Sequence, residues 1–138
     1  MIMQKRVPGF SFLEILMALA IMAMIIAATV PIILNRKKAA DKAATALSMK
    51  NIQQSVELFR SDVGQYPEKL KDLAVMPKDE EIASNWNKHL NEVPKDGWGR
   101  EFKYRLTPDA DNPYELHSYG PKGKKAPKSE WMNVWKLK

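Results

Sequence analysis

The sequence predicts an α+β protein in which one long N-terminal helix packs on a small antiparallel sheet. Three observations lead to this prediction. Residues 15–34 form a continuous apolar run, and the residues after it repeat apolar side chains at helical spacing. Near the C-terminus, short segments alternate apolar and polar residues. The length of 138 residues suits one small domain that contains these parts.

The apolar run covers 20 residues, from Ile15 to Leu34, and contains no charged side chain. A helix of this length spans roughly 30 Å, which is the hydrocarbon thickness of a bilayer. No clear signal-peptidase site follows Leu34, so we expect the mature protein to keep the segment as a single membrane-spanning helix. Basic residues flank it on both sides, and counting charges therefore leaves its orientation open.

Two residues are unusual, Glu14 directly before this segment and Pro31 within it. Glu14 is a carboxylate with apolar Phe12 and Leu13 before it and the apolar run after it. Acidic groups in such surroundings are costly unless paired and usually have a function, although Glu14 could also mark the membrane boundary. Pro31 removes a backbone donor and should kink or locally melt the helix, with a simple kink of no function as the alternative.

The helix is expected to resume after Pro31 as an amphipathic segment. Its apolar stripe follows steps of four and three residues: Thr45, Met49, Ile52, Val56, Phe59 and Val63. Gly64 and Pro67 are typical residues for ending a helix. Two further short helices are predicted over 68–73 and 79–90.

The C-terminal part predicts strands. Phe102, Tyr104 and Leu106 alternate with charged residues, which is typical of a half-buried strand. We expect residues 114–119 to form its antiparallel partner and residues 131–137 to form a third strand. An Asp-Gly pair at Asp96 and Gly97 predicts a tight turn before the first strand.

The N-terminal residues resemble the prepilin peptidase site of type IV pilins and pseudopilins, because Gly9-Phe10 precedes Glu14 and the long apolar run. The resemblance implies cleavage after Gly9 and methylation of the new N-terminal amine of Phe10 by the same enzyme. It also implies that Glu14 pairs with this amine on a neighbouring subunit of a filament. Pro31 falls where the family often has a helix-weakening proline, and the resemblance implies that this stretch loosens when subunits pack into the filament.

A second set of residues narrows the resemblance to the major pseudopilins of type II secretion. They are Gly64, Tyr66 and Pro67, then Pro94-Lys95-Asp96-Gly97-Trp98-Gly99, and later Ser118-Tyr119-Gly120. Gly97 stands where the family usually has proline, a departure that we expect a turn to tolerate. The resemblance implies a structural subunit rather than an enzyme, with a type IV pilin or a competence (DNA-uptake) subunit as the alternative.

The resemblance also implies an organisation, a location and partners. Residues 1–9 would be a cleaved leader and 10–34 a transmembrane and filament-core helix. Residues 35–66 would continue it as an amphipathic helix, and 67–138 would form a small globular region. We expect a single-pass inner-membrane protein whose globular region lies in the periplasm. The implied partners are further copies of the chain, minor pseudopilins, the prepilin peptidase and an inner-membrane assembly platform.

Major pseudopilins typically bind calcium in the loop after the Ser-Tyr-Gly triplet. Here Lys122 stands about where an aspartate is expected, and the loop holds four lysines but a single carboxylate, Glu130. Because calcium requires six to eight oxygen ligands, we expect this site to be lost, with a much weakened site as the alternative, and predict no metal or other cofactor. A contact made by a lysine could hold the loop instead. Asp109 and Asp111 lack the remainder of a calcium-binding pattern and are expected to lie in a solvated turn.

Catalytic and nucleic-acid functions have little support in the sequence. His89 and His117 lack the spacing of metal ligands, and we expect His117 to be exposed. The four tryptophans and neighbouring lysines could suggest binding of single-stranded DNA, but small-domain cores commonly use such residues, so we expect no nucleic-acid partner. The basic C-terminal tail is expected to be solvated, with an acidic partner as the alternative.

Overall fold

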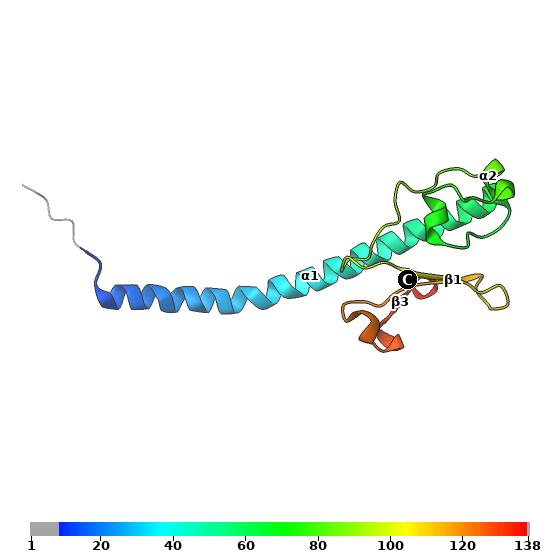
Figure 1. Ribbon diagram of the computed structural model, residues 1–138. Coiled ribbons are helices and arrows are strands. Elements are labelled where there is room, and N and C mark those ends of the chain that lie inside the picture. The colour runs from blue at the N-terminus through cyan, green and yellow to red at the C-terminus, as the bar shows by residue number, and fades with distance from the viewer. Residues whose placement is uncertain (1–8, 138) are drawn as a thin grey trace, which may run out of the picture. The chain divides into compact units, whose positions relative to one another are not determined.

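The computed structural model describes residues 9–137. The helices are α1 (Phe12–Val63) and α2 (Glu80–Asn85), and the strands are β1 (Lys103–Leu106), β2 (Tyr114–Ser118) and β3 (Met132–Asn133) (Figure 1). The chain divides into one compact unit that ends at Lys38 and a second, here called the folded unit, that starts at Ala39. One long helix with a small antiparallel sheet is the predicted α+β class.

The first part of α1 is an apolar helix without buried residues. None of the side chains from Phe12 to Ala40 is buried, and the helix is long and apolar enough to cross a membrane. The Thr29 hydroxyl donates to the carbonyl oxygen of Ile25 at 2.9 Å, which satisfies the hydroxyl inside the helix. The helix continues unbroken through Pro31, so the local melting that we considered is absent here. Loosening at Pro31 within a filament stays a prediction.

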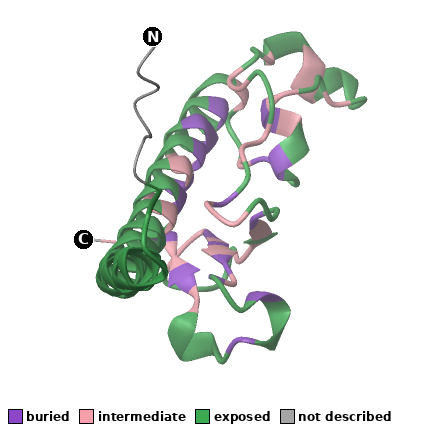
Figure 2. Cartoon of the chain, turned by 90° about the vertical axis from the view of Figure 1, so that its left-hand side faces the viewer, coloured by how far each residue is buried: buried purple, intermediate pink, exposed green. Residues whose placement is uncertain are grey.

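The second part of α1 supplies one wall of the hydrophobic core. Met49, Ile52, Val56 and Phe59 are at most 1% exposed, which confirms the predicted stripe. Figure 2 shows these buried positions along one side of the helix. Their partners come from the turns and strands of the folded unit: Leu70, Leu73, Phe102, Tyr114, Leu116, Met132 and Val134. Burying each large apolar side chain contributes roughly 2 kcal/mol to stability.

The connection from α1 to the sheet is less helical than predicted. Gly64 ends α1 with a left-handed backbone (φ +85°), as expected of a helix C-terminus. Only a short 3-10 turn, Leu70–Leu73, forms within 68–73. The helix predicted over 79–90 is limited to α2 (Glu80–Asn85). Asp79 is its N-cap, and the Asp79 side chain accepts hydrogen bonds from the N–H groups of Glu81 and Ile82. Beyond α2, the backbone N–H groups of His89 and Leu90 donate to the Leu73 carbonyl instead of continuing a helix.

The sheet has three antiparallel strands in the order β1-β2-β3. Tyr104 pairs with Leu116, and His117 pairs with Asn133. Alternate residues of β2, Tyr114, Leu116 and Ser118, are buried. The predicted third strand over 131–137 is largely wrong, because β3 has only two residues. The Asn133 side chain accepts a hydrogen bond from the Trp135 N–H and begins a 3-10 turn over Val134–Lys136.

Candidate functional site

The residues predicted for processing and assembly lie at the start of α1. Gly9 and Phe10 precede the helix, and both are exposed, with the Phe10 side chain 82% accessible. Glu14 lies in the first turn, where it accepts a 3.4 Å hydrogen bond from the Ser11 N–H. A carboxylate in this position interacts favourably with the helix dipole. Within residues 9–137, no cation lies within ion-pair distance of Glu14.

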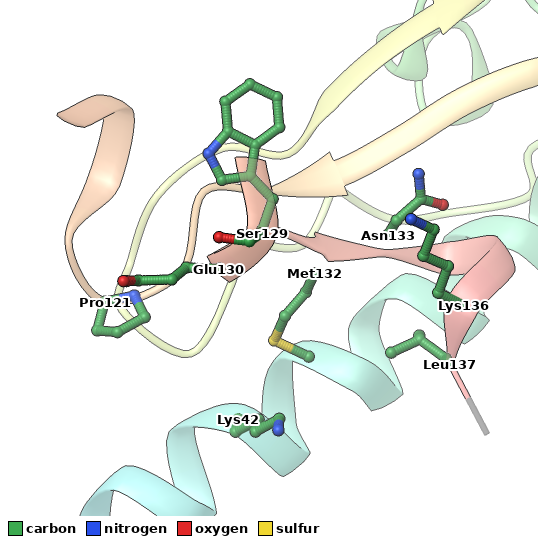
Figure 3. A pocket seen from close by; sticks show the side chains of 9 residues that line it. Lys42, Pro121, Ser129, Glu130, Met132, Asn133, Lys136 and Leu137 are labelled. Atoms are coloured by element: carbon green, nitrogen blue, oxygen red, sulfur yellow. The ribbon is translucent and has the colours of Figure 1, made fainter. Parts of the chain in front are cut away.

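The folded unit has an open groove with three charged side chains in its lining. The groove has a volume of about 440 Å³ and lies between α1 and the C-terminal segment (Figure 3). Its charged side chains are Lys42, Lys136 and Glu130. Residues 9–137 contain no cluster of three potential metal-ligating side chains.

Asp96 is the centre of a buried polar network, and the residue is only 5% exposed. One oxygen accepts hydrogen bonds from the N–H groups of Trp98 and Arg100 at 3.0 and 2.8 Å. The other accepts the Ser118 hydroxyl at 2.6 Å. The Ser118 oxygen in turn accepts the Gly120 N–H at 3.1 Å. A single carboxylate thus joins the turn before β1 to the end of β2, which are the two later motifs of the sequence.

Gly97 anchors the same turn to α1. Its N–H donates to the Thr45 hydroxyl at 2.8 Å, and that hydroxyl donates to the Asp41 carbonyl at 2.7 Å. A Cβ atom added at Gly97 would clash with the Asp41 backbone. The turn thus forms with glycine at this position, and its close approach to α1 leaves no room for a side chain. Proline would both clash with α1 and remove the N–H that Thr45 accepts.

Arg100 connects this turn to the loop over 119–130. Its Nη1 donates to the Gly120 carbonyl at 2.6 Å and its Nη2 donates to the Pro121 carbonyl at 3.2 Å. At the other side of the loop, Lys122 and Glu130 form a 2.7 Å ion pair. Two cationic side chains therefore hold the loop.

His117 lies in an aromatic cluster and is half-buried, so the prediction that it is exposed is wrong. Its ring stacks on Trp131 with centroids 4.7 Å apart and lies edge-on to Tyr119 at 5.3 Å. Its Nε2 atom is buried and has no hydrogen-bond partner among the described residues. Burial lowers the pKa of His117 below its usual 6.5. The neighbouring charges have smaller effects on this pKa. Glu115 raises it, whereas Lys103, Arg105 and Lys128 lower it.

The burial of His117 makes stability depend on pH. With a lowered pKa in the folded state, His117 binds fewer protons there than in the unfolded chain below pH 6.5. Its contribution to stability is present above pH 6.5 and is lost as the pH falls toward its lower folded pKa. Urea unfolding should show this loss in the wild type and a smaller one in His117→Phe, which keeps the stack on Trp131. Identical pH profiles of the two proteins would contradict the assignment.

Sequence reasoning missed the roles of Asp96, Arg100 and Thr45. The Asp-Gly pair indicated a turn, but the partner of Asp96 lies 22 residues further along the chain. Thr45 was recognised only as part of the apolar stripe. A threonine among apolar stripe positions was the one available signal, since a buried hydroxyl requires a hydrogen-bond partner.

A single long apolar helix, a carboxylate in its first turn and a small antiparallel sheet together fit a membrane-anchored subunit of the pilin type. Comparisons with known proteins agree. The family model for type II secretion system (T2SS), protein G, matches residues 32–136. The chain therefore belongs to the type II secretion protein G family.

Individual relatives and a solved structure support this membership. The chain is 30% identical over 128 residues to type II secretion system core protein G of Pseudomonas aeruginosa, covering 88% of this chain and 89% of the relative. It is 27% identical over 134 residues to the Escherichia coli protein of that name, covering 94% and 91%. The fold is similar to the major pseudopilin from the type 2 secretion system of enterohaemorrhagic E. coli. The TM-score is 0.62 at 20% identity, over 75% of this chain and 94% of that one.

Proposed function

We propose that this chain builds the pseudopilus filament of a type II secretion system. The observation that carries the proposal is the exposed apolar surface of α1, which begins at Phe12 and has Glu14 in its first turn. In water such a surface is unstable, so it requires either lipid or other copies of the same helix. Anchored in the inner membrane before assembly, the helix would leave the folded unit in the periplasm, and filament growth would drive export.

We propose that the chain is processed between Gly9 and Phe10. Both residues are exposed and lie ahead of the first helical turn, so a peptidase has access to the bond between them. The new N-terminal ammonium would then lie one helical turn before Glu14. A small shift between neighbouring helices would place the ammonium of one copy beside Glu14 of the next. In an apolar bundle this pair attracts far more strongly than in water.

Intact-mass measurement of the protein purified from membranes tests the processing. We expect a chain that begins at Phe10 and carries one methyl group on its amine. Gly9→Leu should keep the leader, because a bulky residue replaces the one that precedes the cleaved bond, whereas Ser11→Ala is the matched control and should be processed normally. A native protein that retains residues 1–9, or that has lost the apolar helix, would rule out the proposal.

The proposed role is structural, and further copies, minor pseudopilins, the prepilin peptidase and an inner-membrane platform are its proposed partners. Binding of nucleic acid receives no support from the tryptophans, because they serve the fold. The indole N–H groups of Trp86, Trp131 and Trp135 donate to the carbonyls of Asp72, Ala126 and Tyr114. These three indoles therefore help to hold the turns and strands of the folded unit together.

A further inference from the structure

We infer that the Arg100 guanidinium closes the loop over 119–130 as an internal cation, and that this loop folds without a bound metal ion. The inference goes beyond the filament proposal and does not depend on it. It concerns how the folded unit holds its longest C-terminal loop, and it follows from contacts inside that unit alone.

The backbone of Arg100 is held by hydrogen bonds to Asp96, independently of the contacts that its side chain makes with the loop. Its N–H donates to the Asp96 carboxylate at 2.8 Å, and its carbonyl accepts the Asp96 N–H at 2.8 Å. The side chain therefore starts from a rigid turn. Its two terminal nitrogens donate to the consecutive carbonyls of Gly120 and Pro121. Hydrogen bonds from a charged group are stronger than neutral ones, and the planar fork sets the direction of both.

The loop also folds over the guanidinium. Gly123 is buried and has a left-handed backbone (φ +67°). A Cβ atom added there would lie 3.3 Å from the Cζ atom of Arg100, which is tighter than ordinary contact. Three positions of one loop, Gly120, Pro121 and Gly123, thus surround a single positive charge. The absence of a side chain at Gly123 allows this close approach.

A second cation neutralises the only carboxylate of the loop. The Lys122 ammonium lies 2.7 Å from the Glu130 carboxylate, so the start and end of the loop are joined. Figure 3 shows Glu130 and Pro121 close together beside the groove. Both side chains of the ion pair are substantially exposed, and such pairs contribute little to stability. Arg100 is therefore expected to have the larger effect.

The residues of the loop do not fit the calcium ion that the family resemblance implies. Calcium needs six to eight oxygens, several of them anionic. Here the carbonyls of Gly120 and Pro121 already accept from a guanidinium, and Glu130 already pairs with Lys122. A guanidinium at hydrogen-bonding distance from those carbonyls would repel a divalent cation. The chain's own cations occupy the oxygens that a metal would require.

Thermal unfolding of the full-length chain in detergent, followed by tryptophan fluorescence, tests the inference. Millimolar calcium or EDTA should change the Tm of the wild type by less than about 1 °C. Arg100→Gln should lower the Tm by about 5 °C and speed tryptic cleavage in the lysine-rich loop several-fold. The Tm of Arg100→Lys should lie between those of the wild type and Arg100→Gln, because lysine keeps the positive charge but loses the forked pair of N–H donors.

Arg105→Gln is the matched control. It removes the same charge from an exposed arginine of β1, whose partner is Glu115 at 3.0 Å, and should shift the Tm by less than about 2 °C. A clear rise of the wild-type Tm with calcium would overturn the inference. Equal behaviour of Arg100→Gln and Arg105→Gln would also overturn it. Neither outcome involves filament assembly, so the proposed function is tested separately.

Discussion

Replacing Asp96 by alanine is expected to destabilise the folded unit by about 4 kcal/mol. The substitution removes the acceptor of three hydrogen bonds, two from backbone N–H groups and one from the Ser118 hydroxyl. Donors left unsatisfied away from water cost about 1–3 kcal/mol each. Small domains have only about 5–15 kcal/mol of total stability, so this loss removes a large share of it. The turn before β1 and the end of β2 would separate.

Urea denaturation of the wild type and the variant measures this effect. Asp96→Asn should be milder, because its amide oxygen still accepts both N–H groups and its amide nitrogen can donate to Ser118. Asp109→Ala, at an exposed aspartate in the loop between β1 and β2, is the matched control and should change stability by less than about 0.5 kcal/mol. If Asp96→Ala unfolded at the same urea concentration as the control, the network would have no stabilising role.

Glu14→Ala is expected to abolish filament assembly while leaving cleavage after Gly9 intact. In the proposed filament, the N-terminal ammonium of each subunit lies in an apolar bundle, and Glu14 of a neighbour neutralises it. Removing the carboxylate leaves the ammonium buried without a counter-charge. An unpaired buried charge is far more costly than the absence of both partners. Because the defect recurs at every interface, we expect filament yield to fall by at least about 100-fold.

Assembly is measured as the amount of sheared filament relative to total processed subunit. Glu14→Gln keeps the shape of the side chain and should fail as severely, which separates charge from packing. Glu68→Ala removes an exposed carboxylate from the folded unit and is the control. Normal filament yield from Glu14→Gln would show that the ion pair is not required for assembly.

Those parts of the fold that depend on local periodicity could be predicted from the sequence. Met49, Ile52, Val56 and Phe59 repeat at helical spacing, and the same side chains form the helix wall of the core. The alternation around Tyr104 placed β1, and the segment from Tyr114 placed β2 to within one residue. In both cases one face of a regular element is buried, so apolar residues repeat along the sequence with the period of a helix or a strand.

Features that depend on distant partners could not be predicted. Nothing near Asp96 indicates that Ser118 will donate to it, and nothing near Gly97 indicates that the Asp41 backbone will lie against it. His117 alternates with buried residues along β2, which favoured exposure, yet the ring of Trp131, directly before the neighbouring strand β3, stacks on it. In the last segment, the Asn133 side chain accepts a hydrogen bond from the Trp135 N–H and starts a 3-10 turn, which ends the strand. Strand propensity does not predict such a side-chain cap.

The position at which α1 first contributes to the core has a mechanical consequence. Thr45 is the first buried residue of the helix, and none of the residues of α1 up to Ala40, which include the apolar run over 15–34, is buried. The surroundings of this apolar run can therefore change from lipid to neighbouring helices without breaking any interaction that holds the sheet together. Extraction of such a subunit from a bilayer would work against lipid solvation of the helix alone, and the folded unit would stay folded throughout.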